Sequence, residues 1–173
     1  MAAFTVDVSE VERFSDDMRT RALEVVGEEV AKAMSESGAF VEGQAKINAR
    51  RLGAVDTGAL WGSIAWAGRG SGMGRVVEIG TPLEYGAAVE FGVRPGGNAP
   101  PLAPLRRWAE RKLGLSGAES MRFAVNLRFK IARKGIKAKP FLTPAFDDNL
   151  DALDAIFARA GDRAVKRLAK LGA

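Results

Sequence analysis

Cysteine and histidine are both missing from this chain of 173 residues. Without cysteine there is no disulfide framework and no thiolate nucleophile, and without histidine the usual general base at neutral pH is missing. Thiolate and imidazole metal ligands are excluded for the same reason. Ser/Lys and paired-carboxylate chemistry remain as catalytic options, but the two absences favour a protein that is not an enzyme and uses no cofactor.

Long apolar runs are missing as well. No stretch approaches the roughly 20 apolar residues that cross a bilayer, so no membrane contact is expected. The first 12 residues carry three acids and no base, which is unlike a secretory signal. The length suffices for one hydrophobic core and is short for two, so a single domain over residues 1–173 is expected.

Charges of opposite sign gather in different parts of the chain. The formal net charge is +5, but residues 1–42 hold ten acids and four bases, whereas residues 101–140 hold eleven bases and two acids. Three interpretations stay open. The two regions are solvated faces, or complementary patches through which a subunit meets its copies or another protein, or the basic segment contacts nucleic acid.

Apolar periodicity predicts a long first helix. Alternation over residues 4–8 indicates a short strand. Ser9 and Glu12 then form a capping box, and an apolar stripe continues to about residue 49. Gly38 and Gly43 mark places where this helix could break, because an interior glycine costs about 1 kcal/mol relative to alanine.

The rest of the chain predicts a hairpin followed by helices. Strands near residues 60–66 and 75–80 flank a glycine-rich, flexible tip at 68–74, which holds four glycines in seven residues. Helices are expected at 85–92, 104–114 and 118–134, with a basic helical segment at 101–140, and a last helix begins at Thr143. The fold class is therefore α+β, in which a small antiparallel β-sheet of three or four strands is packed by a long N-terminal helix and a C-terminal helix, with short helices between.

Two segments, a glycine-rich tract and an acidic cluster, have compositions that also occur in ligand-binding sites. The tract 68–74 lacks both phosphate-binding glycine motifs and is not followed directly by a helix, so a hairpin tip explains it better. Asp147, Asp148, Asp151 and Asp154 could hold magnesium, but no second acidic cluster supplies further ligands. Stabilisation of a helix N-terminus explains these four carboxylates better.

Aromatic and hydroxyl residues have both a functional and a structural interpretation. Trp108 and Phe123 lie among the bases of residues 106–139, where aromatic stacking with cations could bind a single strand. Both fall on apolar helix stripes, which favours core positions. Thr57 and Ser63 have no nearby base in the sequence and are expected to be cap and turn residues rather than nucleophiles.

Three blocks of sequence, read together, are familiar. They are V-D-T-G-A-L-W-G-S-I at 55–64, I-G-T with Y-G-A-A-V-E-F-G within 79–92, and G-I-K-A-K-P-F-L-T-P-A at 135–145. In this order, with a helix before and after, they resemble the phage minor tail-component family. These are tail-completion or neck proteins typified by the gene-ten-like products of lambdoid siphophages. Gly86 stands where the family often has alanine, and Val93 and Ile136 stand where threonine is usual.

The resemblance implies a structural virion protein without catalytic residues. It would form a homo-oligomeric ring of six copies that joins the head connector to the tail tube. Its implied partners are its own copies, the head–tail connector or stopper protein, and the tail tube or tail terminator protein, with genomic DNA passing through the lumen. Its implied location is the virion, with the host cytoplasm during assembly. A tail terminator that caps the tube is the alternative, and a DNA-binding protein using residues 106–139 is the alternative from another class.

The motif residues are then architectural. Asp56 and Gly58 would set the turn before the hairpin, and Phe141 would plug the core or a subunit seam. Tyr85, Glu90 and Phe91 would brace the short helix against the sheet. The full architectural set is Asp56, Thr57, Gly58, Ser63, Tyr85, Glu90, Phe91, Gly92, Pro140, Phe141 and Pro144. Candidate interface or DNA-facing bases are Arg69, Arg75, Arg106, Arg107, Arg128, Lys130, Arg133 and Lys134.

Overall fold

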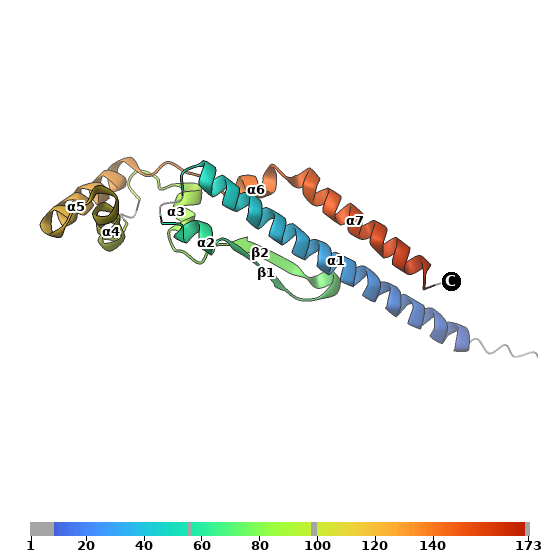
Figure 1. Cartoon of the computed structure of the whole chain (residues 1–173). Helices are drawn as coiled ribbons and strands as arrows, with labels where there is room; N and C mark the ends of the chain where they lie inside the picture. Colours follow the sequence, from blue (N-terminus) through green and yellow to red (C-terminus); the bar gives the residue numbers. More distant parts are fainter. Residues whose placement is uncertain (1–8, 55–56, 98–99, 172–173) are drawn as a thin grey trace, which may run out of the picture. The chain divides into compact units, whose positions relative to one another are not determined.

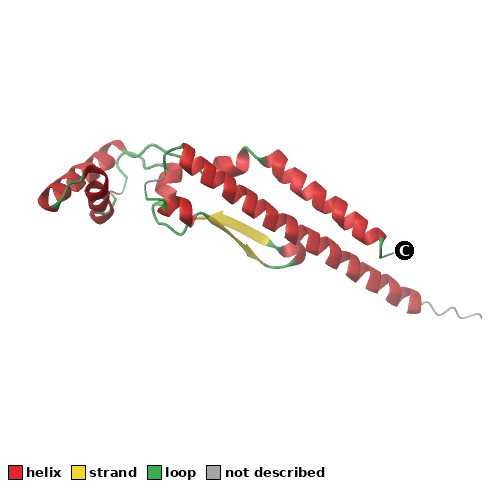
Figure 2. Ribbon diagram, in the orientation of Figure 1, coloured by secondary structure: helices red, strands yellow, loops and turns green. Residues whose placement is uncertain are grey.

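Helix α1 (Ser9–Arg51) begins at the serine that the capping pattern indicated and continues past Gly38 and Gly43 without a break. The structure, a computed structural model, describes residues 9–54, 57–97 and 100–171, with side chains from Glu12 onward. The fold is α+β, as predicted, with helices dominating over one hairpin (Figures 1 and 2). No helix within these described ranges combines the length and apolarity that a bilayer crossing needs.

The described residues fall into two units, and each is treated by itself. The first contains α1 up to Ala45, the segment Ile64–Gly80, and the chain from Pro144 onward. The second contains Lys46–Ser63 and Thr81–Thr143. The expectation of a single domain over the whole chain stays a prediction.

The hairpin of the first unit packs on α1. Strands β1 (Ala65–Arg69) and β2 (Val76–Gly80) pair antiparallel, with Ala65 opposite Gly80. They are the only sheet strands in the described part of the chain, fewer than the three or four predicted. The strand predicted at 4–8 lies outside the described residues, and the segment after Gly58 forms helix α2 (Ala59–Ser63) instead.

Glycines let the hairpin approach the helix closely. A Cβ atom on Gly27 would lie 3.1 Å from the Cα of Gly72, in the short 3-10 turn η1 (Gly72–Gly74) at the hairpin tip. A Cβ atom on Gly38 would lie 2.7 Å from Val77 Cγ1 and 3.0 Å from Trp66 Cδ2. The backbone N–H of Trp66 also donates to Glu42 Oε2 of α1 at 3.0 Å. The tip therefore packs on α1 rather than projecting freely.

Two glycines of α1 are expected to respond oppositely to substitution. Gly38→Ala should lower the free energy of unfolding by about 1–3 kcal/mol, because the new methyl group overlaps the hairpin side chains. Gly43→Ala should raise it by up to about 1 kcal/mol, because no atom lies within 4 Å and alanine favours the helix. Urea unfolding of both variants tests the pair. Equal effects of the same sign would contradict this packing.

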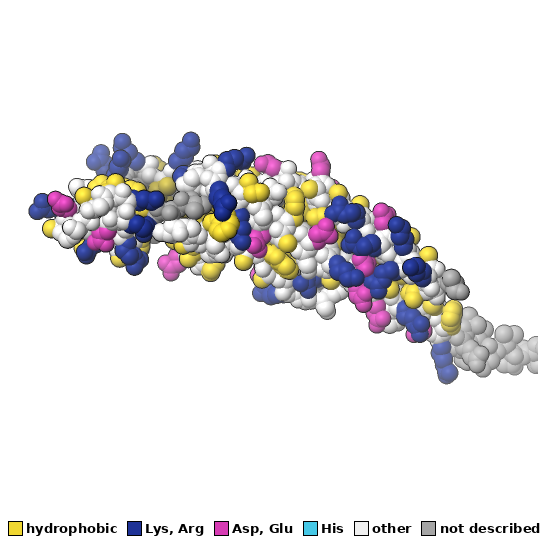
Figure 3. All heavy atoms as spheres, in the orientation of Figure 1, with side chains coloured by type: hydrophobic (Ala, Val, Ile, Leu, Met, Phe, Trp, Pro, Cys, Tyr) yellow, Lys and Arg dark blue, Asp and Glu magenta, His cyan; other side chains and the backbone are white. Residues whose placement is uncertain are grey.

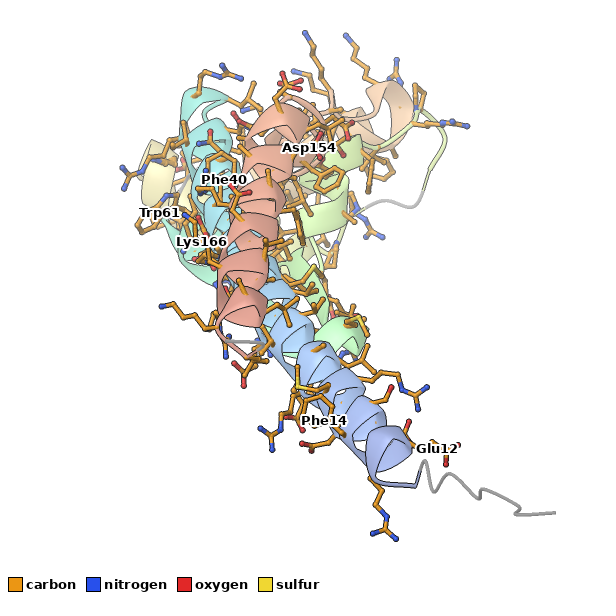
Figure 4. The ribbon with its side chains drawn as sticks, turned by 90° about the vertical axis from the view of Figure 1, so that its right-hand side faces the viewer. Glu12, Phe14, Phe40, Trp61, Asp154 and Lys166 are labelled. Atoms are coloured by element: carbon orange, nitrogen blue, oxygen red, sulfur yellow. The ribbon has the colours of Figure 1, made fainter. Side chains whose placement is uncertain are left out.

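The C-terminal helix lies on the opposite side of α1 from the hairpin. Nine residues separate Gly38 from Glu29, which at about 100° per residue places them on opposite faces, and Glu29 contacts α7 (Leu150–Ala169). Figures 1 and 4 show α7 running along α1. The last helix was predicted to be continuous from Thr143, but it is divided into α6 (Thr143–Asp147) and α7, and Asn149 Nδ2 donates to the Ala145 carbonyl at the break.

The buried stripe of α7 is narrower than its sequence indicated. The buried residues are Leu153, Ile156, Ala160 and Ala164. Phe146, Leu150 and Phe157 share the helical spacing of these apolar residues, but they are exposed. One edge of the apolar face thus stays uncovered.

The second unit is mainly helical. Helix α3 (Gly86–Phe91) ends at Gly92, and helices α4 (Leu102–Leu113) and α5 (Gly117–Lys134) pack together. Trp108 and Phe123 stack with ring centroids 6.1 Å apart and are half-buried, so each packs against the other outside the fully buried core. Gly135 follows α5 with a φ of 73°, a backbone conformation that favours glycine.

Candidate functional site

The second and third sequence blocks meet at a buried carboxylate. Glu90 on α3 is 4% exposed. Its Oε2 accepts the backbone N–H groups of Phe141 at 2.7 Å and Leu142 at 2.9 Å, and its Oε1 accepts that of Thr143 at 2.8 Å. Burial raises the pKa of Glu90, but the three backbone donors outweigh it and hold the pKa below 4.5. Glu90 is therefore an ionised anchor for the connector that precedes α6.

The connector is also fixed from other elements of the second unit. Phe141 is 1% exposed, and its carbonyl accepts a hydrogen bond from Asn48 Nδ2 at 3.2 Å. Lys139 donates its backbone N–H to Val89 O at 2.8 Å and its Nζ to Gly53 O at 2.9 Å. The segment 139–143 is thereby tied to α3 and to the end of α1.

The first block contacts Thr81 of the second block through a hydroxyl group. Thr57 Oγ1 accepts the Ala59 N–H at 3.2 Å, at the start of α2. Ser63 Oγ donates to the Leu60 carbonyl at 2.9 Å and lies 2.7 Å from Thr81 Oγ1. Gly58 has a φ of 83°. Asp56 lies outside the described residues.

Tyr85 and Phe91 are placed differently from expectation. Phe91 is 76% exposed and Tyr85 is exposed as well, so neither side chain is buried against a sheet. Glu90 alone of the three is buried, and it anchors the connector at 141–143 instead. The local sequence does not show that Glu90 is buried while Tyr85 and Phe91 are exposed, because the backbone groups that Glu90 binds lie more than fifty residues away in the chain.

The candidate basic residues divide into two groups. Arg69 is paired with Glu78 across the hairpin, Arg75 lies against Gly68, and Arg106 Nε is 2.8 Å from Glu110 Oε1. The others are surface residues or lie at its edge, and none of them forms an ion pair with a described residue. They are Arg107 on α4 and Arg128, Lys130, Arg133 and Lys134 on α5.

Acids of the first helix are neutralised within the chain. Glu29 is 3% exposed, and its carboxylate lies 2.8 Å from Arg163 Nε, 2.9 Å from Arg167 Nη1 and 3.0 Å from Lys32 Nζ. Figure 3 shows acidic and basic side chains side by side over α7 and the adjoining part of α1.

Two neighbouring acids are paired in the same way. Glu28 Oε2 lies 2.8 Å from Arg167 Nη2, and Glu36 Oε1 lies 2.8 Å from Arg159 Nη2. The acidic N-terminal region, considered from sequence as a patch for a partner, therefore uses three carboxylates to hold its own C-terminal helix. The sequence places Arg159, Arg163 and Arg167 in the last helix, but no local pattern indicates that they pair with acids of α1.

The Glu29 cluster predicts a loss of stability in acid. The hydrogen bond from Arg163, with those from Lys32 and Arg167, lowers the pKa of Glu29 from 4.5 to about 2. Because the folded-state pKa is depressed, the stabilisation is complete above about pH 4.5 and disappears as the pH falls through about 2. Urea unfolding across this range should show Glu29→Gln weaker than the parent at neutral pH and equal to it near pH 2. Glu24→Gln, an exposed control on the same helix, should follow the parent throughout, and a Glu29→Gln variant matching it at neutral pH would contradict the assignment.

The apolar surface of the chain is large relative to its core. Among the described residues, fifteen apolar residues are buried, but eight of them are alanine and only seven are larger. Sixteen large apolar side chains are exposed. They are Phe14, Leu23, Ile47, Met73, Val76, Tyr85, Phe91, Leu113, Met121, Phe129, Ile136, Phe146, Leu150, Phe157, Val165 and Leu171.

The acidic cluster at the start of the last helix is on the surface. Asp147, Asp148, Asp151 and Asp154 are exposed, and none of them forms an ion pair with a described residue. Within the ranges that the structure covers, no group of three or more carboxylates is placed to hold a metal ion. The cluster stays available to a partner of positive charge.

Comparison with known proteins adds one match. Residues 9–92 match the model of the HK97-gp10-like family, described as "Bacteriophage HK97-gp10, putative tail-component". This match confirms the resemblance that the sequence blocks indicated, and it covers the first two blocks but not the third. Neither the curated proteins nor the solved structures gave a significant match.

Proposed function

We propose that this chain, a bacteriophage tail component of the HK97-gp10-like family, acts as a ring-forming subunit at the junction of tail and head. A tail component is a structural part of the virion. In the proposed role, copies of the chain form a ring that completes the tail and joins it to the head connector, and DNA passes through the lumen.

The main support for the proposal is that more large apolar side chains are exposed than buried. Exposed large apolar side chains that lie together mark a binding or assembly surface, as do Phe146, Leu150 and Phe157 along the last helices. Here sixteen large apolar side chains are exposed, against seven buried apolar residues larger than alanine in the described ranges. Removing apolar surface from water contributes about 25 cal/mol per Å², from which the entropic cost of association is subtracted. A subunit that is covered on several sides by copies and neighbours would gain most from this arrangement.

The motif cluster supports the same role. Glu90 holds the connector before α6 mainly through the backbone N–H groups of residues 141–143, so its carboxylate is used to fix the path of the chain. A repeated head-to-tail interface closes into a ring only when each copy presents its surfaces at a fixed angle. We assign the cluster the task of keeping the elements of the second unit in that fixed arrangement.

Particles made without the chain test this function. A phage with the gene inactivated should produce filled heads and tails of normal length that fail to join, as seen by electron microscopy. Supplying the chain from a plasmid should restore joined particles that contain it. Joined, infectious particles without the chain would overturn the proposal.

Tail length separates the tail-terminator alternative. A terminator stops growth of the tube, so its loss should give tails of variable, excessive length. A completion protein acts after the tube is finished, so its loss should leave tail length unchanged.

A DNA-binding role is the second candidate. Phe129 is 65% exposed on α5, next to Lys130 and close to Arg133, which is the combination of stacking platform and cations that binds single strands. Trp108 and Phe123 are used in packing, which leaves a smaller stacking surface than the sequence indicated. Gel shifts with duplex and single-stranded DNA at several salt concentrations test it, and tight binding by the free chain would favour this candidate.

A further inference from the structure

One face of α5 combines an exposed aromatic ring with cations. Phe129 lines a shallow hollow together with Asn126, Lys130, Arg133 and Lys134. Helix α5 holds five bases and one acid, and none of these five bases forms an ion pair with a described residue. The opposite face, with Ser120 and Ala124, is buried. We call the surface around the hollow the basic face.

A second face has the opposite chemistry. Residues 143–158 contain four acids and no base, and all four carboxylates are exposed and unpaired among the described residues. Phe146, Leu150 and Phe157 are exposed between or beside them. Figure 4 labels Asp154 in the first part of α7 and Lys166 near its other end, where the helix becomes basic. We call the surface formed by these apolar residues and acids the acidic face.

We propose that the basic face of one copy docks on the acidic face of a neighbouring copy. This inference rests on the proposed function, because it specifies the contact that would be repeated around the ring. Each face offers what the other lacks: unpaired cations against unpaired carboxylates, and an exposed aromatic ring against exposed apolar side chains. The apolar contacts would supply affinity, and the surrounding charges would set register and association rate.

The internal ion pairs of α1 identify the acidic partner. Glu28, Glu29 and Glu36 are already occupied by arginines of α7, so these acids of the first helix are poor candidates for binding α5 of another copy. The four aspartates at the start of the last helix have no such partner. Charge complementarity therefore points to residues 147–157.

A second copy explains both faces with one contact. DNA would cover the basic face but would be repelled by the acidic one. An unrelated basic protein would cover only the acidic face. Because every copy carries both faces, a single head-to-tail contact repeated from copy to copy covers both, and such a contact generates a ring when its rotation closes.

The absence of cysteine permits a clean cross-linking test on the full chain. Asn126→Cys places a thiol on the basic face, and Ala158→Cys places one beside Phe157; neither removes a charge or a large apolar side chain. After mixing and mild oxidation, the pair should give disulfide-linked dimers at a yield at least about tenfold above the pair Asn126→Cys and Ser71→Cys. Ser71 is exposed at the hairpin tip and serves as the matched control.

Charge reversal tests the cause of the contact. Lys130→Glu with Arg133→Glu in the Asn126→Cys chain should reduce the cross-link about tenfold, because two attractions become repulsions. Asp151→Lys with Asp154→Lys in the Ala158→Cys chain should restore it. Arg128→Glu, on another side of α5, should leave the yield unchanged, and circular dichroism should show that all variants are folded.

Several outcomes would overturn the interface. Cross-linking no higher than in the control pair, or reversal without rescue, would do so. A chain that carries both Asn126→Cys and Ala158→Cys is a further control. If its two thiols form a disulfide within one chain, at a yield that does not fall on dilution of the protein, the two faces meet inside one copy. Loss of duplex DNA binding on reversing Lys130 and Arg133, without any cross-link, would assign the basic face to DNA. If joined particles form normally but the cross-link is absent, this interface is wrong and the proposed function stands. If the cross-link is specific but the chain is missing from particles, the proposed function is wrong and the interface stands.

Discussion

Replacing Glu90 by alanine is expected to lower the free energy of unfolding by about 3 kcal/mol. The substitution removes the acceptor of three backbone N–H groups, those of Phe141, Leu142 and Thr143, in a buried or partly buried place. A buried donor left without an acceptor costs about 1–3 kcal/mol. Urea or thermal unfolding followed by circular dichroism measures the loss, which should appear in the second unit.

Two further variants show whether the carboxylate itself is needed. Glu90→Gln keeps the shape and one oxygen, but its NH₂ group must face one of the three donors, so a smaller loss of about 1–2 kcal/mol is expected. Glu84→Gln, at an exposed position nearby in the chain, should change nothing. If Glu90→Ala were as stable as Glu84→Gln, the anchoring role of Glu90 would be wrong.

Phe141→Ala is expected to have an effect at least as large, about 3–5 kcal/mol. Phe141 is the largest of the fully buried side chains in the described ranges, and its removal leaves a cavity in a core made mostly of alanine. Such a core has few large side chains that could shift into the space. The same unfolding measurement tests this prediction, together with the ability of the variant to enter particles.

Phe91→Ala is the matched control. Phe91 is an aromatic residue in the same unit, but it is 76% exposed, so its truncation should leave the stability of the free chain nearly unchanged. Equal stability of the Phe141→Ala and Phe91→Ala variants would contradict the core position of Phe141. An effect of Phe91→Ala on assembly alone would identify its ring as part of an interface.

Local features of this fold could be predicted from the sequence. Ser9 marks the start of α1, and Gly92 and Gly135 mark the ends of α3 and α5, because caps and positive φ angles depend on a few neighbouring residues. Helical periodicity also placed Trp108 and Phe123 on the apolar stripes of their helices, although it did not predict that the two rings stack. These features need no knowledge of the distant parts of the chain.

Long-range features could not be predicted in the same way. The partner of Glu90 lies 51–53 residues away, and Arg167 lies 138 residues from Glu29, so no local pattern connects them. Phe157 shows the other limit. It shares the spacing of the apolar stripe with Leu153, but one is exposed and the other is buried. Periodicity identifies an apolar face without telling whether the same chain or another one covers it.

The central claim is that the exposed apolar side chains are covered in the assembled particle. Oxidative footprinting of the free chain and of purified particles measures this directly. Phe129, Phe146, Phe157 and Met73 should be modified readily in the free chain and at least severalfold more slowly in particles. Equal modification rates in the two samples, or particles that do not contain the chain, would contradict the account.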